Sequence, residues 1–278
     1  MTTLLNYSKL TLVRATSAAR RALIGRHVDA LLVRGERGIF LVDVEDMSVG
    51  WRLAHDGQYG DAELERLLSV VTEQSTVLMV GTHVGTLAVP AAKHCRQLIA
   101  IEANPRTFQL LQENLLLNGC HNVRALNIAA GDRQEEIQFV LSRTNSGGAK
   151  RMPQVRDYAY FYDSPEVTSV ASHPLDEVLG DAAIDVILMD IEGSEYSALG
   201  GMQRILSRAS VLFMEFIPHH LRNVAGVSVD QLLALIRPHF STLFVPSQNL
   251  CVGRDQFGDV LQTMFGREES DDGIVFRK

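Results

Sequence analysis

The feature that most constrains this chain is a regular alternation of strand and helix patterns that starts near residue 73. Five apolar runs of strand length lie between helical patterns, at residues 76–80, 97–102, 123–129, 184–190 and 211–217. Several of these runs are continuously apolar, as is typical of parallel strands that are buried on both faces. The alternation predicts an α/β fold with a doubly wound, mostly parallel sheet.

The helix signals between these runs are independent of the strand predictions. Asn104 can cap a helix whose first residue is Pro105, because proline is pre-set for the first helical position. Ser194 and Ser228 can each cap a later helix. Pro90 lies where the first crossover helix is expected, so we expect this helix to be kinked or to begin late.

The first 72 residues have a different pattern and predict a small N-terminal α+β extension, followed by a main domain at residues 73–278. Strand patterns at residues 28–34 and 38–43 flank a turn and predict a hairpin. Two short helical stretches follow it, at residues 49–55 and 61–71.

Composition and charge restrict the classes of protein. Hydrophobic residues make up 46% of the 278 residues and charged residues 21%, which is typical of a globular chain. The formal net charge is −7, whereas proteins that follow phosphates usually have a basic surface. We therefore expect no nucleic-acid partner. We interpret the basic residues near the N-terminus as a solvated arm: Lys9, Arg14, Arg20, Arg21 and Arg26.

The sequence gives no signal for a membrane or for disulfides. No segment approaches the about 20 continuous apolar residues of a membrane-spanning helix, and arginines interrupt the one N-terminal stretch that could imitate a signal peptide. We therefore expect no membrane partner and a cytoplasmic location. The three cysteines are too widely spaced for a disulfide framework or a zinc knuckle.

Residues 142–173 combine glycines, mixed charge and a cluster of tyrosines. A long irregular segment within an α/β domain is often a lid or a substrate loop. A surface insertion with partly packed tyrosines is the alternative.

The strongest motif is a buried strand that continues into a glycine-bounded turn, Val-Gly-Thr-His-Val-Gly at residues 80–85. Glycine lets a ligand approach the backbone, and the following helix offers free amides. Glu102 ends the next strand, 21 residues after Gly81. A carboxylate there can accept both ribose hydroxyls of an adenosine, and we expect Glu102 to be partly exposed.

A third element is the apolar run that ends in Asp190 and is followed by Glu192. If the strand geometry continues, alternation puts both carboxylates on the side of the crevice. An NAD cofactor is an alternative, but pyrophosphate favours Gly-x-Gly-x-x-Gly. His83 and Thr86 replace the second and third of those glycines, which favours a sulfonium cofactor without a pyrophosphate.

If such a sulfonium cofactor donates a group to a hydroxyl, the site must align the two reactants and remove a proton. The candidate bases are Asp190, Glu192, Glu215, His219 and His220. Glu215 interrupts an apolar strand pattern, where a charge needs a partner or a ligand. The acidic residues could hold a divalent ion, but no ligand spacing demands one, so the sequence predicts no metal site.

With these residues in view, the chain resembles the FkbM family of methyltransferases, within the Rossmann-like class that uses S-adenosyl-L-methionine (SAM). The matching segments are residues 80–85, 102–105, 115–119, 129–132 and 190–195. The resemblance covers roughly residues 38–218 and implies a seven-stranded sheet.

The resemblance also implies how SAM would bind. The glycine turn would hold the methionine part, Glu102 the ribose and the region of Ile128 the adenine, with Asp190 beside the sulfonium and the acceptor. The cofactor residues expected are Gly81, Thr82, His83, Gly85, Glu102, Asn104, Ile128, Ala129 and Asp190. The residues expected to act in catalysis are Asp190, Glu192, Glu215 and His219.

The family association implies O-methylation of a sugar or a secondary metabolite, and therefore a small-molecule acceptor. A homodimer is one assembly that we consider. Met79 stands where the first motif of the family usually has an aspartate. This difference motivates an alternative from another class, in which the domain binds SAM or another nucleoside without catalysis and acts as a regulatory or assembly partner. An NAD-dependent oxidoreductase is a third hypothesis.

Overall fold

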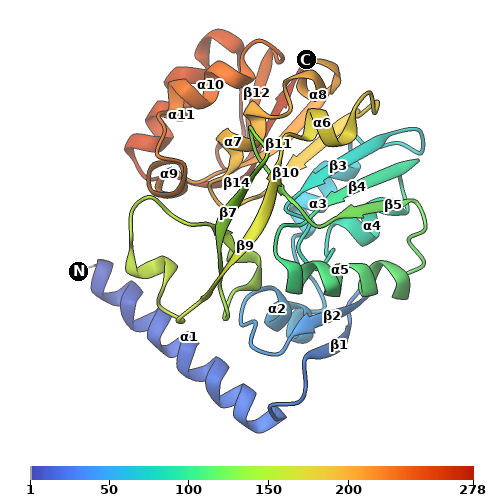
Figure 1. Ribbon diagram of the computed structural model, residues 1–278. Helices are drawn as coiled ribbons and strands as arrows, with labels where there is room; N and C mark the ends of the chain where they lie inside the picture. Colours follow the sequence, from blue (N-terminus) through green and yellow to red (C-terminus); the bar gives the residue numbers. More distant parts are fainter. Residues whose placement is uncertain (1) are drawn as a thin grey trace.

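The computed structural model describes residues 2–278, with side chains from residue 8 onward. An eight-stranded sheet forms the centre of the fold (Figure 1). Neighbouring strands from β11 to β5 are parallel, and the remaining pairs are antiparallel. In spatial order the strands are β13 (Leu250–Gly253), β12 (Thr242–Val245), β14 (Asp271–Arg277), β11 (Val211–Phe216), β10 (Val186–Met189), β3 (Thr76–Val80), β4 (Gln97–Ile101) and β5 (Val123–Leu126).

The α/β, doubly wound fold is confirmed, but the sheet has one strand more than the seven expected. The additional edge strand β13 alternates half-buried and exposed residues, so it has no apolar run that would predict it. Asn249 has a φ of 48°, in the left-handed region that asparagine tolerates in turns. The chain therefore reverses there, and β13 pairs with β12.

Side-chain alternation in β3 explains why helices cover both faces of the sheet. Val77 and Met79 belong to one apolar core and Leu78 and Val80 to another, since successive residues of a strand point to opposite faces. The first core contains α2 (Val49–Asp56), α3 (Asp61–Leu68), α4 (Ala88–Ala92) and α5 (Pro105–Leu117). The second contains α6 (Leu175–Leu179), α7 (Glu195–Gly200), α8 (Gln203–Arg208), α10 (Val229–Ile236) and α11 (Phe257–Gly266).

The helix starts agree with most of the sequence signals. The Asn104 side chain accepts hydrogen bonds from the first amides of α5, and Ser228 forms a capping box with Gln231 at α10. The helix α4 begins late, at Ala88, with Pro90 inside its first turn, where a missing N–H is tolerated.

The helix predicted after Ser194 is instead two short helices, α7 and α8, and Ser194 makes no capping hydrogen bond. The break has a tertiary cause. A Cβ atom at Gly201 would lie 1.8 Å from the carbonyl oxygen of Gly131. The Asp176 carboxylate, from α6, accepts hydrogen bonds from the backbone amides of Arg204 and Ile205 and so starts α8 separately.

A second sheet replaces much of the segment that the sequence predicts to be irregular. It consists of β6 (Ala129–Ala130), β9 (Glu166–His173), β7 (Glu135–Leu141) and β8 (Lys150–Arg151). Both β8 and β9 lie within residues 142–173, so this segment is not a single long loop. The strand expected at residues 123–129 is divided, because β5 ends at Leu126 and the next two alanines pair with β9.

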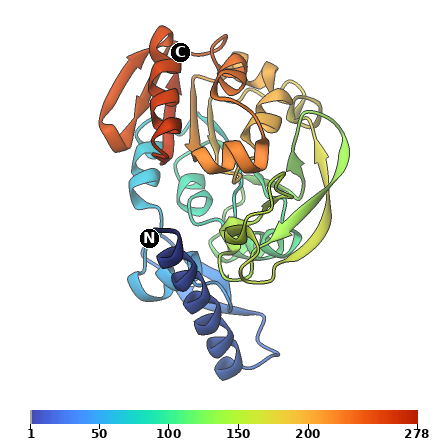
Figure 2. The same cartoon turned by 90° about the vertical axis from the view of Figure 1, so that its left-hand side faces the viewer.

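The N-terminal segment contains α1 (Thr2–Ile24) and the predicted hairpin of β1 (Ala30–Arg34) and β2 (Ile39–Asp43). The prediction that the basic N-terminal residues form a solvated arm is wrong, because Arg14 and Arg20 of α1 donate hydrogen bonds to the carbonyls of Tyr162 and Asp46. Figure 2 shows α1 at the opposite end of the molecule from the C-terminus. The division at residue 72 stays a prediction.

Among residues 2–278, no helix combines the length and the apolar character that crossing a membrane requires.

One buried amide connects the N-terminal hairpin to the main sheet. Asn114 of α5 is fully buried. Its Oδ1 accepts from the amide of Leu41 at 2.6 Å, and its Nδ2 donates to the carbonyls of Leu41 at 3.0 Å and Val84 at 2.8 Å. The strand β2 is therefore attached to the turn that follows β3.

We expect Asn114→Ala to lower the free energy of unfolding by about 2–4 kcal/mol, because it leaves several buried backbone groups unpaired. Urea unfolding measures this loss. Asn127→Ala is a matched control, since the exposed Asn127 also donates to two carbonyls. A loss in Asn114→Ala no larger than in the control would contradict the prediction.

Candidate active site

A cavity of about 810 Å³ lies at the carboxyl ends of β3, β4 and β10. From β3 the chain continues outward to β4 and β5, then returns at β10 on the other side of β3. The loops after β3 and β10 therefore diverge, and open α/β sheets bind ligands at such a switch point. The volume is within the usual range of about 300–1,000 Å³ for small-molecule sites.

The glycine turn forms the floor of this cavity. Gly81 has a φ of 86°, and a Cβ atom on it would lie 1.7 Å from the carbonyl oxygen of Asp190. Only glycine fits there. Thr82 and His83 also line the cavity, and His83 has a φ of 54°, which turns the chain toward Glu102.

Glu102 is buried at the end of β4, with 7% of its surface exposed, so the expectation of a partly exposed acid is wrong. Its two oxygens accept hydrogen bonds from the amides of His83 at 2.7 Å and Asn104 at 2.8 Å. Burial raises the pKa of Glu102 to about 7, although the amides lower it. Each oxygen keeps a second lone pair, and Glu102 lines the cavity.

Two expected cofactor residues lie outside the cavity lining. Gly85 has a φ of 92° and lies where a Cβ atom would be 2.9 Å from Leu111, so it permits close packing of α5. Asn104 caps α5 and donates its amide to Glu102. Both support the site indirectly.

Ile128 and Ala129, expected near the adenine, line one wall of the cavity. Ile137 and Phe139 of β7 complete this apolar wall. These two residues were not among those predicted, because β7 belongs to a sheet that was not predicted. The alternation of apolar and polar residues within 135–141 was the sequence signal that could have predicted this strand.

Asp190, Glu192 and Glu215 all line the cavity. Asp190 is exposed where it lines the cavity, but the protein packed around it removes much of its solvation. This desolvation, together with the charge of Glu192, raises the pKa of Asp190 well above the ordinary value. Burial and the charge of Asp190 likewise raise the pKa of Glu215. The buried Glu195 shapes this loop by accepting from the amides of Ile191 and Gly193.

A buried lysine that was not predicted joins these acids. Lys150 of β8 donates from Nζ to Glu192 at 2.8 Å and lies 3.5 Å from Nε2 of His220. His220 belongs to the short helix α9 (Pro218–His220). Burial and the nearby Lys150 lower the pKa of His220 to about 2, so its ring is neutral. No pattern in the sequence indicates that Lys150 is buried.

His219 lies elsewhere. Its Nδ1 is 3.0 Å from the hydroxyl of Tyr160, and it is not part of the cavity lining. Its neighbour His220 contacts the acids instead. The catalytic role of His219 stays a prediction that the geometry does not support.

A family model described as the methyltransferase FkbM domain matches residues 80–269. The chain belongs to this family. The matched region contains the glycine turn, Glu102 and the loop after β10, so the FkbM resemblance inferred from these motifs is confirmed.

The chain is also similar to solved structures and to curated proteins. An FkbM methyltransferase from Methylobacillus flagellatus KT is 18% identical, over 74% of this chain and 44% of that chain, with a TM-score of 0.43. The tRNA m1G37 methyltransferase of Methanocaldococcus jannaschii is 12% identical, over 91% of this chain and 58% of that chain, with a TM-score of 0.44. Ribosomal RNA small subunit methyltransferase A of Desulforapulum autotrophicum is 37% identical over 57 residues, 20% of each chain. The chain spans about a fifth of the length of the curated relatives it matches.

The expectation that nucleic acid is not a partner is wrong. The solved structures to which this chain is similar include tRNA methyltransferases, and a formal net charge of −7 does not by itself exclude contacts to phosphates. Net charge describes the whole surface, whereas contacts to phosphates depend on local groups.

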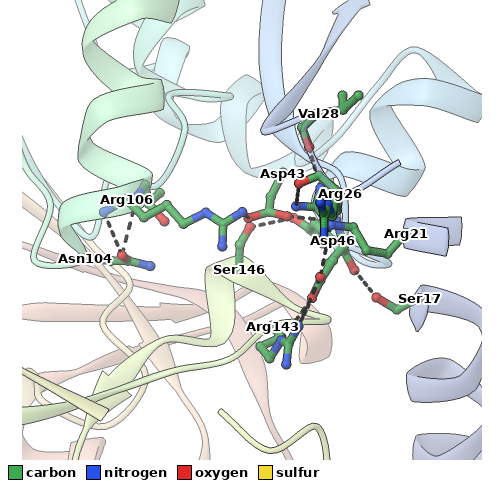
Figure 3. A network of polar contacts seen from close by, with 12 residues as sticks. Ser17, Arg21, Arg26, Val28, Asp43, Asp46, Asn104, Arg106, Arg143 and Ser146 are labelled. Atoms are coloured by element: carbon green, nitrogen blue, oxygen red, sulfur yellow. Dashed lines mark hydrogen bonds and ion pairs between the residues drawn. The ribbon is translucent and has the colours of Figure 1, made fainter. Parts of the chain in front are cut away.

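A buried network connects the N-terminal extension of this FkbM protein to its glycine turn. The Ser146 hydroxyl donates to Asp46 at 2.6 Å and lies 2.7 Å from Nε2 of His83. Since Ser146 uses its hydrogen for Asp46, the ring of His83 donates its own from Nε2. Figure 3 shows Asp46 and Ser146 within a wider network in which Arg106 pairs with Asp43.

We expect Ser146→Ala to lower the free energy of unfolding by about 1–2 kcal/mol, because it removes a partner from two buried polar groups. Urea unfolding of the variant and the parent measures the difference. Ser169→Ala removes a hydroxyl from an exposed hydrogen bond with Gln138 and should change stability by less than about 0.5 kcal/mol. A loss of unfolding free energy in Ser146→Ala no larger than in Ser169→Ala would contradict the prediction.

Proposed function

We propose that this FkbM-family protein transfers a methyl group from SAM to a hydroxyl oxygen of a small molecule. One observation carries the proposal: the glycine turn after β3, Glu102 and Asp190 all line a single cavity at the switch point of the sheet. These are the segments that the FkbM resemblance associates with the methionine part, the ribose and the sulfonium.

The chemistry of the walls supports SAM as the cofactor. Glu102 retains lone pairs toward the cavity that can accept ribose hydroxyls. The apolar wall formed by Ile128 and Phe139 suits an adenine ring. Asp190 has no ion-pair partner among residues 8–278, and a positively charged sulfonium would supply one.

The acidic residues near Asp190 in the cavity support an oxygen acceptor. Transfer from SAM is an in-line displacement, in which the C–O bond forms as the C–S bond breaks, and the hydroxyl proton must leave. Asp190, Glu192 and Glu215 line the same cavity, and a carboxylate within reach of the acceptor hydroxyl can take its proton. The cavity volume of about 810 Å³ leaves room for a small acceptor beside the cofactor.

Binding of S-adenosylhomocysteine should depend on pH through Glu102. With a pKa of about 7, this carboxyl is mainly ionised at pH 8 and mainly protonated at pH 6. The ionised form accepts ribose hydroxyls better. We therefore expect binding up to about tenfold weaker at pH 6 than at pH 8, measured by calorimetry.

Glu102→Gln should bind more weakly at pH 8 and lose most of this pH dependence. Glu177→Gln, a change at an exposed position, is the matched control and should behave as the parent. The same pH dependence in Glu102→Gln as in the parent would remove Glu102 from the ribose site.

Methyl transfer itself is tested with SAM labelled in its methyl group and a panel of sugars, phenols and other hydroxyl compounds, with tRNA and rRNA transcripts included. We expect a labelled methyl ether from a small acceptor. Asp190→Asn should lower turnover more than SAM affinity, while Asp181→Asn at an 87% exposed side chain should change neither.

Two results would contradict this proposal. Labelling of RNA alone would overturn the small-molecule acceptor. Tight SAM binding without turnover on any acceptor would favour a non-catalytic SAM-binding domain.

A further inference from the structure

We propose that Glu192, Glu215 and His220 form a binding site for one divalent transition-metal ion, such as Mn²⁺ or Zn²⁺. One ligand atom from each side chain lies within 4.8 Å of the others. The three residues come from the loop after β10, from β11 and from α9. They are brought together because β10 and β11 are adjacent parallel strands that end at the same edge of the sheet.

The strongest sign of a missing ligand is Nδ1 of His220. The His220 side chain is only 7% exposed, and its buried Nδ1 has no hydrogen-bond partner within the described part of the chain. This atom faces Oε2 of Glu215 at 3.7 Å. A buried polar atom without a partner is unfavourable, and a bond to a metal ion would satisfy this one.

Glu215 also lacks a direct partner. Its side chain is 9% exposed, and no residue from 8 to 278 donates a hydrogen bond to its carboxylate. Lys150 supplies one ammonium group, but it contacts Glu192. Two largely buried carboxylates, with side chains 18% and 9% exposed, therefore share one cation, and Asp190 adds a third acid nearby. Buried negative charge of this kind favours a bound cation.

The donor atoms select the class of ion. Two carboxylates and one imidazole suit Mn²⁺ or Zn²⁺ better than Ca²⁺ or Mg²⁺, which prefer oxygen ligands alone. Ligand bonds of about 2.1 Å in a tetrahedral site put neighbouring ligand atoms about 3.4 Å apart. The 3.7 Å between Nδ1 of His220 and Oε2 of Glu215 is close to that spacing.

Only the chemical use of the ion rests on the proposed function. A divalent ion beside the acceptor would act as a Lewis acid and make a hydroxyl proton easier to remove.

The site is tested with the full chain, after treatment with EDTA and without cofactor. Mn²⁺ is titrated into the protein, and the loss of the electron paramagnetic resonance signal of free Mn²⁺ reports binding. We expect one Mn²⁺ per chain, displaced by Zn²⁺. His220→Gln exchanges one neutral side chain for another, and it should weaken binding at least tenfold, about the smallest effect of disturbing a metal site.

Further variants distinguish coordination of the ion by specific side chains from a general attraction of Mn²⁺ to acidic residues. His239→Gln, at a half-buried histidine that contacts Gln203, is the matched control and should bind Mn²⁺ as the parent does. Glu215→Gln should bind more weakly. Lys150→Gln should bind more tightly, because it removes a competing positive charge. Thermal unfolding of each variant establishes that it is folded.

Three results would overturn the site: no stoichiometric binding of Mn²⁺ or Zn²⁺, equal binding by His220→Gln and the parent, or unchanged affinity in Lys150→Gln. Calorimetry with S-adenosylhomocysteine in the presence of EDTA separates this failure from failure of the proposed function. Cofactor binding there supports the methyltransferase even if the metal site is absent.

Discussion

The close approach of two neighbouring strand ends is the constraint on which the rest of the site depends. The chain at Gly81 passes so near the carbonyl oxygen of Asp190 that a Cβ atom would lie 1.7 Å from it. Because β3 and β10 are adjacent and parallel, this contact fixes where their loops separate. The cavity, the glycine turn and the acids after β10 all take their positions from that separation.

The walls of the cavity come from parts of the chain that are far apart in sequence. The N-terminal extension is held by Asn114 and by the contact between Asp46 and Ser146, while the second sheet supplies the apolar wall and Lys150. Buried polar groups of this kind must be paired, so they fix the relative positions of these parts. The main sheet thus forms only one side of the cavity.

Part of this site could be predicted because its signals are local. The glycine turn, Glu102 and Asp190 each follow an apolar run at a recognisable spacing, and all three line the cavity. Their surroundings could not be predicted. The exposure of Glu102 was misjudged because its burial depends on amides and walls contributed by other segments. His220, rather than His219, contacts the acids because of the direction in which α9 leaves β11.

The sequence by itself determined the doubly wound α/β fold, the FkbM family and the order of the motifs, because apolar periodicity and turn residues act over a few neighbours. Only the tertiary structure decided that the basic N-terminal segment is a docked helix, that β13 extends the sheet and that Lys150 lies beside Glu192. The physical reason is that burial and charge pairing depend on contacts between distant segments. Lys150 and Glu192 are 42 residues apart, and no local pattern records such a contact.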